Sequence, residues 1–91
     1  MNLTNKLSYE RALIDSIDEQ IVKLLASRVQ AAKRIAEIKA KYGLGIYNGK
    51  RETEVLLRVR ELSMTYNLNP DKIEAIFKAI ISYCREVQED I

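Results

Sequence analysis

The first 42 residues contain neither glycine nor proline, and this uninterrupted stretch constrains the fold more than any other feature. Apolar residues recur in it at the spacing of one face of an α-helix. We predict one helix from Ser8, as N-cap, to Lys41, with Gly43 as the left-handed residue that follows it. Such a helix is about 50 Å long, whereas a compact domain of this size is roughly 30 Å across. We therefore predict a homodimer built around paired long helices.

Two breaks in the helical pattern delimit two shorter helices. The glycines and the proline lie at these breaks, at Gly43, Gly45 and Gly49 and in the run Asn67 to Pro70. We predict a second helix from Asn48 or Gly49 to about Tyr66, with Gly49 and Glu52 as a weak capping box. A third helix is predicted from Asn69, its N-cap, to the C-terminus, with the proline at its first position. The predicted fold class is all-α, with three helices in a single domain over residues 1–91.

The composition limits the chemistry that the chain can perform. The sequence has no histidine and one cysteine, which argues against histidine-based catalysis, a zinc site and an intrachain disulfide. A net charge of +2 is weak evidence for a nucleic-acid partner, and no apolar run is long enough to span a membrane. We predict no metal, cofactor, nucleic acid or membrane partner. The single Cys84 is typical of a reducing compartment, so we expect the protein in the cytoplasm.

Two cations interrupt the apolar stripe of the first helix. The stripe consists of Ile14, Ile17, Ile21, Leu24, Leu25, Ala32, Ile35 and Ile38. Arg28 and Lys39 fall in the middle of it, and a buried cation without a partner costs several kcal/mol. A structural salt bridge is the usual explanation for one such cation, but two on one stripe favour a pocket for an anion. Arg11, near the edge of the stripe, either pairs with Asp15 or reaches across a dimer interface.

The other two helices contribute further polar residues to inward faces. The inner face of the second helix is predicted to hold Val55, Val59, Leu62 and Tyr66. Towards the N-terminus of the helix, the same face carries Arg51 and Glu52. Glu52 is expected either to pair with a nearby cation (Arg28, Lys39 or Arg51) or to accept a hydrogen bond from a ligand hydroxyl. The third helix is predicted to bury Ile73, Ile76, Phe77, Ile80, Cys84 and Val87. Gln88 flanks that stripe, either exposed in a fraying last turn or donating into the same pocket.

These residues together predict a pocket for a small, doubly anionic, hydroxylated ligand. The pocket offers no nucleophile, metal ligand set or conventional base. It suits a rearrangement whose transition state separates charge.

The spacing of residues in the first helix resembles a known family. The run Arg11-x6-Asp18-x2-Ile21-x2-Leu24-Leu25-x2-Arg28-x6-Ile35-x3-Lys39 is similar to the first helix of the all-helical, AroQ-class chorismate mutases. The glycine-containing loop, Arg51-Glu52 at the start of a second helix and Gln88 near the end of a third also match. The resemblance implies an intertwined homodimeric helical bundle. It also implies cofactor-free rearrangement of chorismate to prephenate, an isomerase reaction of phenylalanine and tyrosine biosynthesis.

The resemblance also implies roles for individual residues. Arg28 is expected to bind one substrate carboxylate, and Arg11 of the partner subunit the other. Lys39 and Gln88 are expected to donate hydrogen bonds to the ether oxygen, where negative charge grows as the C–O bond breaks.

Four more residues complete the expected substrate contacts. The resemblance implies that Glu52 accepts from the ring hydroxyl and that Arg51 sets the carboxylate geometry. Asn48 stands where many members have an acid, and Cys84 where a serine or another small residue is frequent. Two alternatives remain: an isochorismate pyruvate-lyase on the same fold, or a non-catalytic dimerisation or regulatory module.

Overall fold

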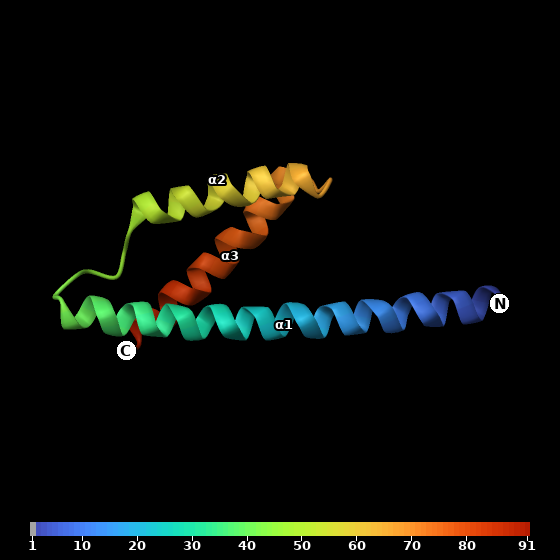
Figure 1. Ribbon diagram of the computed structural model, residues 1–91, viewed down its shortest axis with the longest axis horizontal. Coiled ribbons are helices and arrows are strands. Elements are labelled where there is room, and N and C mark those ends of the chain that lie inside the picture. The colour runs from blue at the N-terminus through green and yellow to red at the C-terminus, as the bar shows by residue number, and fades with distance from the viewer. Residues whose placement is uncertain (1) are drawn as a thin grey trace.

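Three α-helices account for most of residues 2–91, which the computed structural model describes. They are α1 (Leu3–Lys41), α2 (Gly49–Thr65) and α3 (Pro70–Glu89). In Figure 1, α1 runs the length of the molecule, and α2 and α3 lie beside its C-terminal half. Helix α3 packs on both other helices, whereas α1 and α2 do not pack on each other within the described residues. The all-α fold class and the three helices are as predicted.

The start of α1 differs from the prediction, because Asn2 rather than Ser8 is its N-cap. The side chain of Asn2 accepts a hydrogen bond from the backbone N–H of Asn5 at 2.8 Å. Nothing between Leu3 and Ser8 breaks a helix, so the helix begins at the earlier cap and is longer than predicted by nearly two turns. At the other end Gly43 has a φ of 68°, which confirms the predicted left-handed residue.

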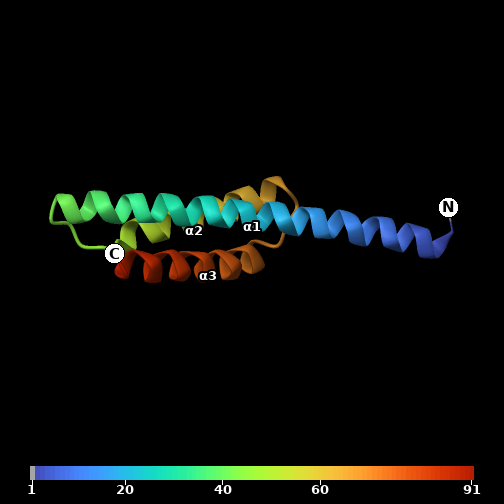
Figure 2. The same ribbon diagram turned by 90° about the horizontal axis from the view of Figure 1, so that it is seen from below.

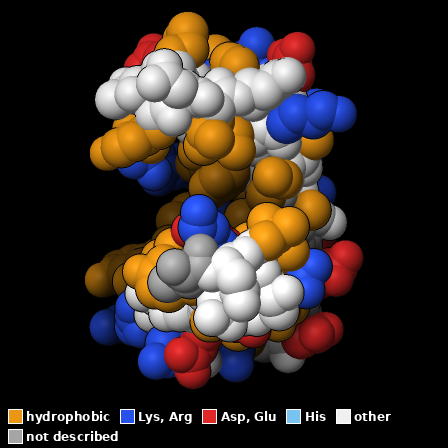
Figure 3. All heavy atoms as spheres, turned by 90° about the vertical axis from the view of Figure 1, so that its right-hand side faces the viewer, with side chains coloured by type: hydrophobic (Ala, Val, Ile, Leu, Met, Phe, Trp, Pro, Cys, Tyr) orange, Lys and Arg blue, Asp and Glu red, His pale blue; other side chains and the backbone are white. Residues whose placement is uncertain are grey.

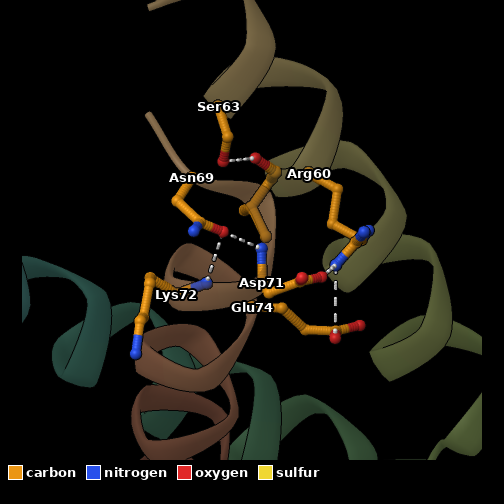
Figure 4. Close-up of polar contacts among 7 residues, drawn as sticks. Arg60, Ser63, Asn69, Asp71, Lys72 and Glu74 are labelled. Atoms are coloured by element: carbon orange, nitrogen blue, oxygen red, sulfur yellow. Dashed lines mark hydrogen bonds and ion pairs between the residues drawn. The ribbon is translucent and has the colours of Figure 1, made fainter. Parts of the chain in front are cut away.

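The N-caps of the two shorter helices are asparagines. Asn48 caps α2 by accepting from the N–H of Arg51 at 3.1 Å, so the predicted capping box of Gly49 and Glu52 is wrong. Asn69 caps α3 as predicted, and its side chain accepts from the N–H groups of residues 71 and 72 (Figure 4). With Pro70 in its first turn, α3 therefore begins where the sequence predicts, although it ends at Glu89 rather than at the last residue.

The core between the helices consists of small side chains. The buried residues are Ala32 and Ala36 on α1, Val55, Val59 and Ser63 on α2, and Cys84 on α3. The prediction for α2 was partly wrong, because Leu62 and Tyr66 are exposed and Ser63 is buried instead. Ile76 on α3, also predicted to be buried, is exposed. Among the described residues, α2 packs on α3 alone, so it buries a narrow face and the residues beside that face stay exposed.

The N-terminal half of α1 projects beyond the other two helices (Figures 1 and 2). The molecule measures 61 × 25 × 16 Å, with a radius of gyration of 17.3 Å. A compact domain of this length has a radius of gyration of about 12 Å. Apolar residues on the projecting half lie exposed, and Ile14 retains 55% of its accessible surface. In the view from the N-terminal end of α1, hydrophobic side chains lie at the surface (Figure 3). One chain therefore leaves much of the predicted apolar stripe uncovered. Within the described part of the chain, no helix is sufficiently long and apolar to span a membrane.

Candidate active site

The three helices and the loop before α2 line a half-open cavity of about 270 Å³. Its walls come from the C-terminal half of α1, from Ile46 and Asn48 in the loop, from the first turns of α2 and from the last turns of α3. Seven of the eight residues predicted from the sequence line it: Arg28, Lys39, Asn48, Arg51, Glu52, Cys84 and Gln88. The structure therefore brings together residues that lie up to 60 positions apart in the chain.

The charge around the cavity is strongly positive. Four cationic side chains and one carboxylate line it, which leaves a formal net charge of +3. The remaining wall is mainly apolar and includes Ile35, Val55 and Ile81. Low-dielectric walls strengthen the attraction between fixed cations and an anion. The arrangement favours a small ligand with more than one negative charge.

Arg28 and Lys39, the two cations of the apolar stripe, make hydrogen bonds but no ion pairs. The Nη1 of Arg28 donates to the Sγ of Cys84 at 3.0 Å, and the Nζ of Lys39 donates to the carbonyl oxygen of Ile46 at 2.9 Å. Neither cation is paired with an acid within residues 2–91. Both side chains are half-buried and line the cavity. Because neither has an acidic partner among the described residues, the alternative explanation by structural salt bridges is wrong.

Gln88 and Cys84 both belong to α3, and the side chain of each contacts α1. The Nε2 of Gln88 donates to the carbonyl oxygen of Ala32 at 3.0 Å, and the side chain is half-buried. The alternative that places Gln88 exposed in a fraying turn is therefore wrong. Cys84 is a buried free thiol, as predicted for a small core residue, and its contact with Arg28 puts it at the cavity wall.

Arg51 and Asn48 lie at the rim of the cavity. The side chain of Arg51 is mostly exposed and lies 3.7 Å from the carboxylate of Glu54, one turn further along α2. Asn48 uses its side-chain oxygen to cap α2, so this oxygen is already engaged. Both residues line the cavity through their positions at the entry to α2.

Glu52 pairs with a residue that the sequence interpretation missed. Its carboxylate accepts two hydrogen bonds from Arg85 of α3, one from Nη2 and one from Nε at 3.1 Å. The predicted partners Arg28, Lys39 and Arg51 are therefore wrong. The bond to Glu52 is the main reason that the pKa of Arg85 lies above its ordinary value, with burial opposing it.

The sequence did contain a signal for Arg85. It lies four residues after Ile81 and three before Gln88, which places all three on one face of α3. The ring of Tyr47, from the loop, lies over its guanidinium at 5.0 Å, although no function was predicted for any tyrosine.

Arg11 is the one predicted site residue outside the cavity. It lies exposed on the projecting half of α1 and makes no ion pair with Asp15 or any other described acid. Along the axis of α1 it is about 25 Å from Arg28. Arg11 therefore cannot reach the cavity of its own chain.

Comparison with known proteins identifies the family. The sequence model for chorismate mutase type II matches residues 10–89 of this chain. The chain belongs to the chorismate mutase type II family. It is 34% identical to a protein of Methanocaldococcus jannaschii named chorismate mutase, over 96% of this chain and 88% of that protein. The predicted resemblance to the all-helical chorismate mutases is thereby confirmed.

Other members of the family are much longer than this chain. A bifunctional chorismate mutase/prephenate dehydratase of Aquifex aeolicus is 38% identical over 89% of this chain, but over only 23% of its own length. The T-protein of Enterobacter agglomerans is 34% identical over 89% of this chain and 22% of its own length. The chain thus spans most of the archaeal chorismate mutase and less than a quarter of these two relatives.

Proposed function

We propose that the cavity binds chorismate and that its residues catalyse the rearrangement to prephenate. Membership of the chorismate mutase type II family makes the chain an isomerase of phenylalanine and tyrosine biosynthesis. The observation that carries the site assignment is the pair of cations Arg28 and Lys39, which lie on an apolar helix face without acidic partners. We propose that a dianionic substrate supplies the missing negative charge, and that residues 1–91 act as one catalytic domain.

Lys39 and Gln88, the proposed hydrogen-bond donors, are each held by one hydrogen bond within the protein and still have unused N–H groups. An ammonium has three N–H groups and a carboxamide has two. Lys39 uses one for Ile46 and Gln88 uses one for Ala32, so each retains at least one for the ether oxygen of the substrate. Donors fixed in advance stabilise developing charge without reorganisation during the reaction. They therefore favour the transition state over the ground state.

Binding also has to hold the substrate in a reactive shape. In an intramolecular rearrangement all the reacting atoms belong to one molecule. A site that binds the compact conformer of this molecule therefore lowers the entropic part of the barrier. We propose that Arg28 holds one carboxylate and that Glu52 accepts from the ring hydroxyl, with Arg51, Asn48 and Cys84 as further contacts. The apolar wall lowers the local dielectric constant and so strengthens these polar contacts.

We further propose that the second carboxylate is held by Arg11 of the partner subunit in an intertwined homodimer. The accessible surface of the chain is 7308 Å², whereas a compact monomer of this mass exposes about 5,400 Å². The difference is of the size that one subunit buries in an obligate dimer. Because Arg11 is too far from its own cavity, a second α1 laid along the exposed stripe is the simple way to bring it to one.

The reaction tests the proposal directly. Purified protein is incubated with chorismate, and the product is identified by chromatography against authentic prephenate. We expect prephenate to form faster than in a protein-free control. Incubation with isochorismate is the matched control, and release of pyruvate from it without any prephenate from chorismate would identify a lyase instead.

Substitution of Gln88 with glutamate should make the activity dependent on acid pH. The wild-type amide is neutral at all pH values, so we expect no steep loss of its activity above pH 6. A glutamate at this position donates to the ether oxygen only when protonated, and its ordinary pKa is about 4.3. We therefore expect the variant to be active near pH 4–5 and to lose activity as the pH rises. Profiles of kcat/KM against pH for both proteins measure this, and identical profiles would contradict the role of Gln88.

A further inference from the structure

We propose that Arg85 is a positioning residue, which holds the Glu52 carboxylate in the orientation that accepts the substrate hydroxyl. This inference rests on the proposed function, because it assigns a task to Arg85 in the same cavity. Arg85 comes from α3 and Glu52 from α2, so the pair joins two walls of the cavity. Both side chains are half-buried.

The geometry of the pair fixes the carboxylate. Two parallel N–H groups of a planar guanidinium bind both oxygens of Glu52, which prevents the carboxylate from rotating. A carboxylate has about four acceptor positions, and this pair uses two of them. The remaining positions have defined directions, so that Glu52 stays able to accept a hydrogen bond from a ligand.

Tyr47 confines Arg85 from the other side. Its ring lies over the guanidinium at 5.0 Å, a distance typical of a cation–π contact. Gly49 leaves room for this ring, because a Cβ at Gly49 would lie only 2.8 Å from the Tyr47 hydroxyl oxygen. The loop before α2 thus places the ring of Tyr47 over the same guanidinium that binds Glu52.

Arg85 also keeps Glu52 away from the substrate-binding cations. Arg28, Lys39 and Glu52 all line one cavity of about 270 Å³. A mobile carboxylate there would pair with one of these cations and neutralise the charge that the substrate needs. With Arg85 as its partner, Glu52 leaves both cations free of ion pairs, as observed in the described residues.

Another arginine also forms ion pairs between the same two helices. Arg60 of α2 contacts Asp71 at 2.9 Å and Glu74 at 3.4 Å on α3 (Figure 4). The side chains of Arg60 and Arg85 are equally exposed, at 35%. Arg60 lies outside the cavity, so it is a matched control for the loss of an arginine between α2 and α3.

A double-mutant cycle on kcat/KM tests the proposal. The wild type is compared with Arg85→Ala, Glu52→Ala and the double variant, and with Arg60→Ala as control. We expect Arg85→Ala to lower kcat/KM about 10- to 100-fold, the effect of a hydrogen bond to a charged group. Because Arg85 acts through Glu52, the double variant should be no slower than Glu52→Ala alone. Arg60→Ala should change kcat/KM less than about twofold.

Other results of the double-mutant cycle and its control would overturn the positioning role or the proposed function. Multiplicative effects in the double variant would overturn the proposal, since Arg85 would then act on the substrate itself. An equal loss in Arg60→Ala would overturn it in favour of a structural role. Arg85→Lys, which keeps the charge but not the paired hydrogen bonds, should show an intermediate loss, and it serves if Arg85→Ala does not fold. A wild type that forms no prephenate would reject the proposed function as well, whereas an active wild type with unchanged Arg85 variants rejects only the positioning role.

Discussion

Replacement of Lys39 with alanine is expected to lower kcat about 10²- to 10³-fold, the usual effect of removing one preorganised donor to a developing negative charge. Replacement of Arg28 with alanine should lower kcat/KM by at least as much, because it removes the proposed contact with a substrate carboxylate. Neither change should unfold the protein. Among the described residues, Lys39 donates to a loop carbonyl and Arg28 to a thiol, and neither is paired with an acid, so neither substitution leaves a buried carboxylate without its partner.

The matched control for these variants is Lys41→Ala. Lys41 lies on the same helix, is exposed, and has its Nζ 5.8 Å from the centre of the Tyr42 ring. We expect its activity to equal that of the wild type. Circular dichroism and light scattering report whether each variant keeps its helices and its assembly. Loss of fold or assembly in the Arg28 and Lys39 variants, instead of a loss of turnover in an intact assembly, would support a non-catalytic helical module.

Substitution of Ile21 with lysine is the second change with a large expected effect. Ile21 is half exposed on the projecting half of α1, within the stripe that we propose a second copy covers. A charge buried there without a partner costs several kcal/mol, and the symmetry of a dimer places it at the interface twice. We expect association to weaken by at least a hundredfold, with loss of both helical structure and activity at micromolar concentration.

The control places the same charge on the opposite face of the helix. Ala26 is exposed and lies about 180° from Ile17 around α1, outside the apolar stripe. Ala26→Lys should therefore retain the mass of a dimer in light scattering and the activity of the wild type. A monomeric wild type, or an Ile21→Lys protein that still assembles and turns over, would contradict the proposed dimer.

Local signals in the sequence were sufficient for the helices and for most of the cavity. Asn69 and Pro70 marked the start of α3, and Gly43 the end of α1, because capping depends on residues within one turn. Arg28 and Lys39 were placed by helical periodicity alone, since a charge on an apolar face needs a partner wherever the helix packs. These inferences required no knowledge of how the helices cross.

The pairing of Glu52 could not be predicted in the same way. Its partner Arg85 lies 33 residues away on another helix, and four cations compete for one acid in the cavity. Only the crossing of α2 and α3 decides among them. The same reason explains why Ser63 replaced Leu62 in the core, because the buried face of a helix depends on how many neighbours it has. At α1 the error was of another kind, since both Asn2 and Ser8 are acceptable N-caps.

We propose that cations from two copies of the chain surround one dianionic substrate, and complementation between inactive variants measures this directly. Arg11→Ala and Arg28→Ala are produced together with different affinity tags, and the heterodimer is isolated on both tags in turn. If Arg11 serves the cavity of its partner, each heterodimer contains one intact site and one with both substitutions. We expect about half of the wild-type activity per dimer, from two proteins that are each nearly inactive. A heterodimer no more active than its parents would contradict it.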